Sequence, residues 1–438
     1  WMESVFGNIS PASYESVQKM DLHKLINYYS NYEEKPHRTI TDPTIEGLND
    51  VIKLDVKNNI LKYTHNIEVI YSAPIGFQYS WIIGLWQYCY DNKTYIDSSD
   101  VFILILKIIS SANFKKDYVD DNSFRNKNKW FAHRVLSLLN CGLDCHGHMF
   151  SVQNLPLVKE IILDLYKNDN DAEIVKDRDI SHQYFNSYSG ELYGALIEYN
   201  VVEAYKSNAP IGNRWDDDIK CILDSKLSKE QKNPLFFYAL GNKFYSLLWI
   251  DESWLKNILT IEDCDNWKGF MVGFHFNNIV SQVFEDFCNS GQYDRFFSNR
   301  DYFDSVTQNR VIQYICTAYY SEKINFDLNS PLLISVLNER NALDYENIIQ
   351  FFYRKHKDLP IEKVKDLWRY MYHLNKELDN DVSKYFIGES YRWLDFFDNI
   401  DEEIKEWMLL SVKNLQPFSA SEVIKKLTVY TKNNPIQV

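Results

Sequence analysis

Apolar residues recur every three or four positions along much of the chain, and this spacing predicts amphipathic helices. The pattern is clearest in the C-terminal half, where apolar stripes run over residues 267–287, 361–378, 404–415 and 423–430. Ser419 and Glu422 stand at capping-box spacing before the last stripe. We find no convincing run of alternating apolar and polar residues that would predict strands. The pattern therefore favours an all-α fold.

The composition agrees with this fold class. The 438 residues include only 14 Gly and 11 Pro, roughly half of average usage, whereas a sandwich, barrel or propeller needs a turn every ~8–12 residues. Hydrophobic residues make up 45% and charged residues 25%, which excludes disordered and collagen-like classes. No repeat consensus of fixed period is present. We predict a helical-repeat, solenoid-like array of degenerate helix pairs.

Three polar stretches, residues 110–129, 168–189 and 207–233, interrupt the apolar pattern. We interpret them as loops between helices or as subdomain boundaries. They predict an N-terminal helical subdomain over 1–120, a middle helical subdomain with polar loops over 121–235, and a C-terminal helical subdomain over 236–438.

The charge and the cysteines restrict the partners and the compartment. The formal net charge is -14, the wrong sign for a phosphate-binding surface, so we expect no nucleic-acid partner. No signal peptide opens the chain, and no apolar run approaches the ~20 residues of a membrane span. The seven cysteines are scattered and odd in number, which favours reduced thiols over a disulfide framework. We therefore expect a cytoplasmic protein without a membrane partner.

The densest group of metal-ligating residue types is Cys141, Cys145, His146 and His148. Thiolate and imidazole are the preferred ligands of zinc, but four ligands so close in sequence rarely all reach one tetrahedral ion. A helix that ends before Gly142 explains the same residues as a C-terminal cap. We expect no metal, and whether these four residues ever bind one stays open.

Other candidate chemistry is weaker. Arg369 and His373 share a helix face, but their spacing is one residue shorter than in helical RNases of the HEPN class. The carboxylate clusters at 216–218 and 117–121 are more typical of helix caps and solvated charge. No phosphate-binding loop or nucleophile elbow is present. We therefore predict no catalytic residue and no cofactor in this segment.

Four residues lie off the apolar stripes and within the polar stretches: Tyr184, Tyr188, Arg214 and Trp215. Tyr, Trp and Arg are enriched at the energetic centres of protein interfaces, and loops on a rigid scaffold commonly carry recognition. We predict that these four residues lie in loops and belong to a surface that binds a partner.

Two blocks of sequence carry a family resemblance. The first contains Asp251 and Trp254 as an Asp-x-x-Trp motif, followed by Trp267-Lys-Gly-Phe270. The second runs from Leu-Trp-Arg-Tyr at 367–370 through Glu389 and Trp393 to Trp407. This order resembles the C-terminal helical regions of bacterial anti-phage proteins, the antiviral STAND NTPases and certain sirtuin-domain defence proteins. The residues that carry it look like packing positions rather than chemistry.

The resemblance implies a helical sensor that binds a phage protein, the large terminase or the portal. Binding would release a central ATPase, which oligomerises and activates an N-terminal effector. This chain has no phosphate loop or effector motif and begins with Trp1, so we interpret it as the sensor portion of a longer polypeptide, which would carry any NTPase and effector. Two alternatives stay open: a helical nuclease or metal-dependent hydrolase, and a non-sensing helical scaffold for self-assembly.

Overall fold

The computed structural model describes residues 8–34, 42–65, 67–112, 114, 127–143, 149–167, 179–228, 232–279, 281–355, 360–397, 400–415, 421, 423–426 and 428. All regular secondary structure in these ranges is α-helix or short 3-10 helix, which confirms the predicted all-α class. The chain divides into two compact units, residues 1–274 and 275–438. None of the described helices is both long enough and apolar enough to span a bilayer.

The first unit contains the following helices: α1 (Tyr14–Lys19), α2 (Leu22–Ser30), α3 (Ile45–Asn58), α4 (Ile60–Thr64), α5 (Ile67–Tyr71), α6 (Ile75–Asn92), α7 (Ser99–Ser110), α9 (Lys127–Leu143), α10 (Leu155–Tyr166), α11 (Ile180–Phe185), α12 (Tyr188–Lys206), α13 (Asp217–Ser228), α14 (Pro234–Asn242), α15 (Phe244–Ile250), α16 (Glu252–Lys256), η1 (Asn257–Thr260) and α17 (Cys264–Phe274). The second unit contains α18 (Ser281–Asn289), α19 (Gln292–Ser298), η2 (Arg300–Tyr302), α20 (Ser305–Tyr320), α21 (Pro331–Glu339), α22 (Ala342–Lys355), α23 (Ile361–Asn375), α24 (Asp381–Glu389), η4 (Ser390–Phe396) and α25 (Glu402–Lys413).

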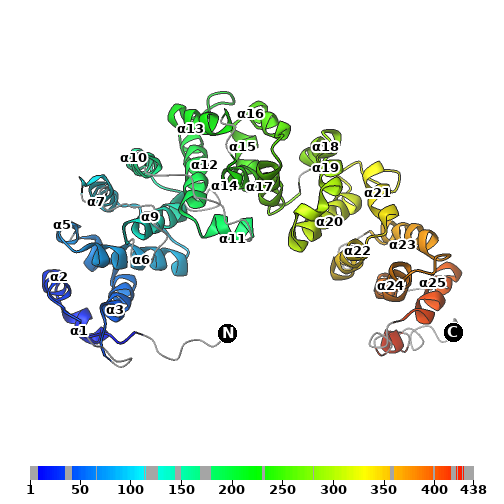
Figure 1. Ribbon diagram of the computed structural model, residues 1–438, viewed down its shortest axis with the longest axis horizontal. Coiled ribbons are helices and arrows are strands. Elements are labelled where there is room, and N and C mark those ends of the chain that lie inside the picture. The colour runs from blue at the N-terminus through cyan, green and yellow to red at the C-terminus, as the bar shows by residue number, and fades with distance from the viewer. Residues whose placement is uncertain are drawn as a thin grey trace. The chain divides into compact units, whose positions relative to one another are not determined.

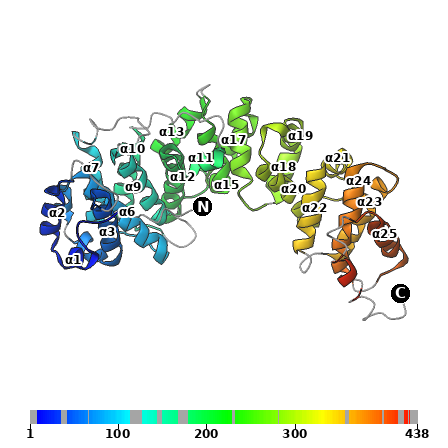
Figure 2. The same cartoon turned by 60° about the horizontal axis from the view of Figure 1, so that its bottom comes forward.

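The helices of the first unit pack in chain order as an array. In one layer α3, α6, α9, α12, α14 and α17 each contact the next. A second layer of α5, α7 and α10 lies beside them, and α10 also contacts α9 and α12 (Figure 1; Figure 2). Successive helices thus form pairs that bury one continuous apolar core, as expected of a solenoid-like array.

The second unit repeats this arrangement over fewer helices. α20 contacts α22, α22 contacts α24 and η4, and α24 contacts α25. Two tyrosine hydroxyls connect these helices to α21 and α23. Tyr345 of α22 donates to the Leu337 carbonyl of α21, and Tyr319 of α20 donates to the Lys363 carbonyl of α23, both at 2.7 Å. The tryptophans of the predicted stripes lie in the cores, because Trp267 is 2% exposed and Trp407 is 1% exposed.

The division into units differs from the three predicted subdomains. α9 follows the expected boundary near residue 120 but packs against α6, which precedes it. α14 begins at the expected boundary near 235 and packs against both α12 and α17. Helices on either side of each expected boundary therefore contact one another. The polar stretches are not simple loops either, because 207–233 contains α13 and 168–189 contains α11.

The stripe over 267–287 predicted one helix, whereas the structure has two, α17 and α18. The break falls at residues 275–279, at the start of the second unit. Arg310 donates to the His275 carbonyl at 3.1 Å, and the Tyr314 hydroxyl donates to the Asn277 carbonyl. Tertiary hydrogen bonds thus satisfy carbonyls that a continuous helix would have used. The predicted helices at 361 and 402 are confirmed, while Ser419 and Glu422 lie outside the described residues.

Glycines allow α14 and α17 to approach closely. A Cβ atom at Gly269 would lie 2.3 Å from the Pro234 carbonyl oxygen, and one at Gly273 would lie 2.2 Å from the Tyr238 carbonyl oxygen. Such distances exclude any side chain without separation of the two helices. The glycine of the Trp-Lys-Gly-Phe block is therefore a packing residue, as the sequence suggested.

Candidate recognition surface

Two of the predicted partner-binding residues, Tyr184 and Tyr188, are buried. Tyr184 lies in α11, only 5% exposed, and its ring lies 4.5 Å from that of Tyr238 between centroids. Burial raises the pKa of its hydroxyl. Tyr188 begins α12, is 6% exposed, and donates to the Leu165 carbonyl at 2.7 Å. The prediction that they lie in loops is wrong: both belong to helices and present little surface to a partner.

The cause of this error is local. Asp179 and Ser187 made the stretch look like a loop, but their side chains cap α11 and α12 by accepting the backbone N–H groups of Ser181 and Gly190. Short polar residues favour caps as strongly as they favour loops, so polar composition does not separate the two.

Arg214 and Trp215 do lie in a connection, between α12 and α13. The buried Asn200 of α12 fixes this segment from both sides. Its Nδ2 donates to the Arg214 carbonyl at 2.9 Å, and its Oδ1 accepts the Asp216 N–H at 2.7 Å. Asp216 in turn caps α13 and pairs with Lys159 of α10 at 2.8 Å. Arg214 and Trp215 are therefore held in place by buried polar contacts rather than carried on a free loop.

Trp215 packs against Trp254 of α16, with the ring centroids 5.1 Å apart in an edge arrangement. Its indole N–H donates to Asp251 Oδ2 at 3.1 Å, and the indole N–H of Trp254 donates to Asp224 at 2.6 Å. Asp251 also accepts the backbone N–H of Trp254 at 3.0 Å and so caps α16. The Asp-x-x-Trp motif is thus a helix cap that also positions a second tryptophan.

Arg214 lies over the ring of Trp249, with its guanidinium carbon 4.0 Å from the centroid. The same guanidinium donates to the Trp249 carbonyl and, at 3.4 Å, to the Ala209 carbonyl. A cation over an indole face is attractive, and the hydrogen bonds fix its direction. The arginine therefore keeps one face against Trp249 and remains partly open to solvent.

We call Arg214, Trp215, Trp249 and Trp254 the Arg–Trp surface. Trp249 is 37% exposed, Arg214 and Trp215 are half-buried, and Trp254 lies beneath them at 8%. The indole N–H groups of Trp215 and Trp254 are bonded internally, so these residues offer mainly ring area to a partner. The sequence predicted Arg214 and Trp215 as partner-binding residues, and Trp254 entered only as part of a resemblance block.

The other sequence candidates have structural surroundings of their own. Arg369 donates to both carboxylate oxygens of Glu403, at 2.6 and 2.8 Å, and also to Asp366, and these carboxylates raise its pKa. Its neighbour His373 is exposed on α23.

Of the proposed zinc ligands only Cys141 lies within the described residues; Cys145, His146 and His148 lie outside them, as do Asp117, Asp120 and Asp121. Among the described residues no three His, Cys, Asp or Glu side chains are grouped closely enough to hold a metal ion.

Comparison with known proteins adds no relative: no protein-family model matches the chain, nor does any curated protein or solved structure.

Proposed function

We propose that this chain is a recognition region that binds a partner protein through the Arg–Trp surface. The observation that supports the proposal is the half-exposed pair of Arg214 and Trp249, backed by Trp215 and Trp254. Arg and Trp dominate the energetic centres of protein interfaces, especially where their side chains are held in place before binding. Here hydrogen bonds to Asp251 and Asp224 orient both inner rings before any partner arrives.

The resemblance supports a more specific proposal. The chain would be the sensor of a bacterial anti-phage immune protein that acts in the cytoplasm and binds a phage structural or packaging protein, the terminase or the portal. Binding would trigger an effector carried elsewhere in a longer polypeptide, with oligomerisation after activation. The helical array suits this role, because stacked helix pairs present extended surfaces on which scattered anchors can contact a large partner.

Affinity capture from infected cells tests the proposal. Tagged chain would be recovered from bacteria infected with a panel of phages, and the enriched phage proteins would be purified and titrated against it. We expect a structural or packaging protein to bind, and the double variant Arg214→Ala, Trp249→Ala to weaken its affinity at least tenfold.

The matched control is the double variant Tyr90→Ala, Lys93→Ala. This pair also places a cation over an exposed ring in the first unit, at 4.7 Å. This control variant should bind the phage protein with the affinity of the unmodified chain. Recovery of no phage protein across the panel would contradict the sensor role, and equal affinity of the Arg214→Ala, Trp249→Ala variant would contradict the assignment of the surface.

A further inference from the structure

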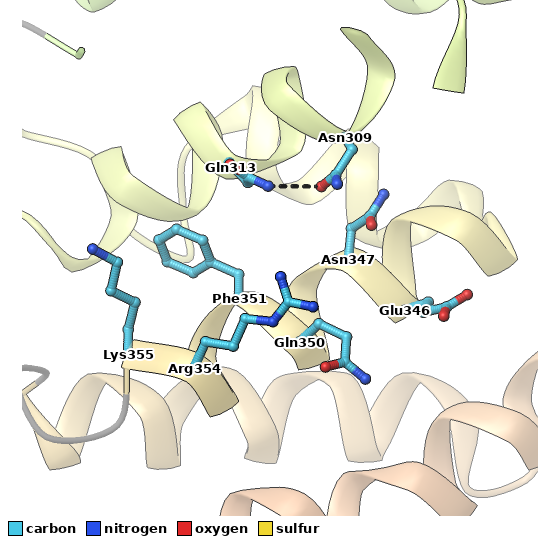
Figure 3. A pocket seen from close by; sticks show the side chains of 8 residues that line it. All are labelled: Asn309, Gln313, Glu346, Asn347, Gln350, Phe351, Arg354 and Lys355. Carbon is cyan, nitrogen blue, oxygen red and sulfur yellow. Dashed lines mark hydrogen bonds between the residues drawn. The ribbon is translucent and has the colours of Figure 1, made fainter. Parts of the chain in front are cut away.

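The second unit has a cavity of about 390 Å³, lined by residues of α20 and α22 (Figure 3). Its polar lining comes from both helices: Asn309, Gln313, Asn347, Gln350, Arg354 and Lys355. We call this feature the amide groove. Its volume lies near the lower end of the range, about 300–1,000 Å³, in which proteins hold small ligands or single segments of a larger one.

Four residues with side-chain amides line the groove: Asn309 and Gln313 on α20, and Asn347 and Gln350 on α22. Gln313 donates to Asn309 at 3.0 Å along α20, and Asn347 of α22 points toward the space between the helices in Figure 3. The Nδ2 atom of Asn347 is buried from solvent and has no hydrogen-bond partner within the described part of the chain. A buried donor without a partner lowers stability, and its retention is typical of a site that binds a ligand.

The groove also holds two cations at one end. Arg354 and Lys355 are exposed, and no ion pair to either is found among the described residues. Many other cations of this acidic chain are paired, as Arg369 is with Glu403. The opposite end of the lining carries a single carboxylate, Glu346. The lining is therefore polarised along α22, positive toward its C-terminus and negative toward its N-terminal half.

We propose that the amide groove binds a short extended peptide segment that carries an acidic residue. A side-chain amide both donates and accepts, as a peptide unit does, so Asn347 and Gln350 match the N–H and C=O groups of an extended backbone. From Glu346 to Arg354 the helix rises about 12 Å, the length of about four extended residues. The acidic side chain would meet Arg354 and Lys355 in charge-assisted hydrogen bonds.

A nucleic acid is the competing occupant, because Asn and Gln amides also bond to base edges and Phe351 offers a ring at the same wall. The net charge of -14 and Glu346 within the groove both oppose a polyphosphate backbone. A peptide with one or two carboxylates needs only the two cations that are present. This inference concerns the second unit and does not depend on the Arg–Trp surface.

Selection from an mRNA-display library of random linear dodecapeptides tests the proposal with the full chain as bait. Enriched peptides would be labelled with fluorescein and titrated by anisotropy. We expect Asp or Glu to be enriched, and affinity to fall about tenfold or more in Asn347→Leu and in Arg354→Ala. Lys413→Ala, which removes an equal charge at the end of α25, should change affinity less than twofold.

Charge reversal separates a lost contact from a lost fold. Arg354→Glu should abolish binding of the selected acidic peptide. The same variant should bind a second peptide in which Lys replaces the acidic residue. Circular dichroism melts of all variants show whether they fold. Three outcomes would overturn the proposal: no acidic enrichment, affinities that Asn347→Leu and Arg354→Ala leave unchanged, or displacement of the peptide by a fluorescent oligo(A) RNA that binds through the same residues.

Discussion

The Arg–Trp surface and the amide groove treat their polar atoms in opposite ways. In the first, the indole N–H groups of Trp215 and Trp254 have carboxylate acceptors within the chain. In the second, the Asn347 amide nitrogen is buried without a partner in the described residues, and Arg354 has no ion pair there. One site is complete before binding, while the other leaves hydrogen-bonding capacity unused.

This difference separates two ways of preparing for a ligand. A preorganised aromatic surface gains affinity because little conformational freedom is lost on binding, and its internal hydrogen bonds also stabilise the fold. An incomplete polar groove gains affinity from hydrogen bonds that only the ligand supplies, and it is less stable without one. Removal of an internally bonded side chain should therefore lower stability at the first site, whereas removal of the unpartnered Asn347 amide should leave stability unchanged or raise it at the second.

Trp254→Ala should give the largest effect. The side chain is 8% exposed and packs against Trp215, so its removal leaves a cavity and a carboxylate, Asp224, without its donor. We expect the free energy of unfolding of the first unit to fall by about 3–5 kcal/mol, measured by urea denaturation. Trp249→Ala, at a ring 37% exposed, should cost far less. Equal losses would mean that the surface is not layered as described.

Asp251→Ala should come next. This carboxylate caps α16 and also accepts the indole N–H of Trp215. Loss of an N-cap costs about 1 kcal/mol and loss of the second hydrogen bond about as much, so we expect about 2 kcal/mol in urea denaturation. Asp251→Asn keeps one acceptor oxygen, enough for one of the two hydrogen bonds, and its NH2 group can only donate, so it should recover about half of the loss. If Asp251→Ala changed the tryptophan emission equally in the unmodified chain, which has 11 tryptophans, and in a Trp215→Phe background, the positioning role of Asp251 would be refuted.

The sequence predicted the fold class and the helices that carry strong apolar stripes. Trp267 and Trp407 were placed on buried helix faces, and both are buried. The unit boundary at 275 was missed because the apolar spacing continues across it, while the break depends on hydrogen bonds from Arg310 and Tyr314. Periodicity records which faces are apolar and carries no information on such tertiary hydrogen bonds.

The candidate sites were predicted only in part. Arg214 and Trp215 were predicted because they lie off the apolar stripes and within a polar stretch. Their contacts to Trp249 and Trp254 could not be predicted, because they join residues more than thirty positions apart. The amide groove gave no sequence signal at all. Asn347 lies on the polar side of an amphipathic helix, where the sequence pattern does not distinguish an unpartnered buried amide from a solvated one. The groove forms only where α20 and α22 pack together, and this contact cannot be inferred from the polar side of one helix.

Asn347→Leu should shift stability in the opposite direction. Leucine has a similar size and needs no hydrogen bond, so the substitution removes a buried donor that has no partner among the described residues. We expect the free energy of unfolding to rise by up to about 1 kcal/mol. Asn309→Leu, at the facing wall, removes an acceptor that Gln313 uses and should be destabilising. Destabilisation by Asn347→Leu would show that the amide is satisfied in solution, which would remove the contrast between the two sites.

Glu203→Gln should give the smallest effect. It tests whether the polar groups beside the Arg–Trp surface all have hydrogen-bond or charge partners. Burial, together with the charge of Asp216, raises the pKa of Glu203, against the opposing charge of Lys159. The folded protein therefore holds this proton more tightly than the unfolded chain, so stability falls as pH rises through the folded pKa. At pH 7 the ionised carboxylate is unfavourable, and glutamine should add about half a kcal/mol or less, because the side chain is partly exposed.

The difference between Glu203→Gln and the unmodified chain should vanish as pH falls below the ordinary range of a glutamate, in urea denaturation repeated from pH 4 to pH 8. Glu160→Gln, at an exposed position of α10, serves as the control for the substitution itself. A gain of several kcal/mol in the free energy of unfolding at pH 7 would mean that Glu203 and Asp216, beside the segment that carries Arg214 and Trp215, repel each other without compensation. In that case both sites would hold unsatisfied polar groups, and preorganisation would no longer distinguish them.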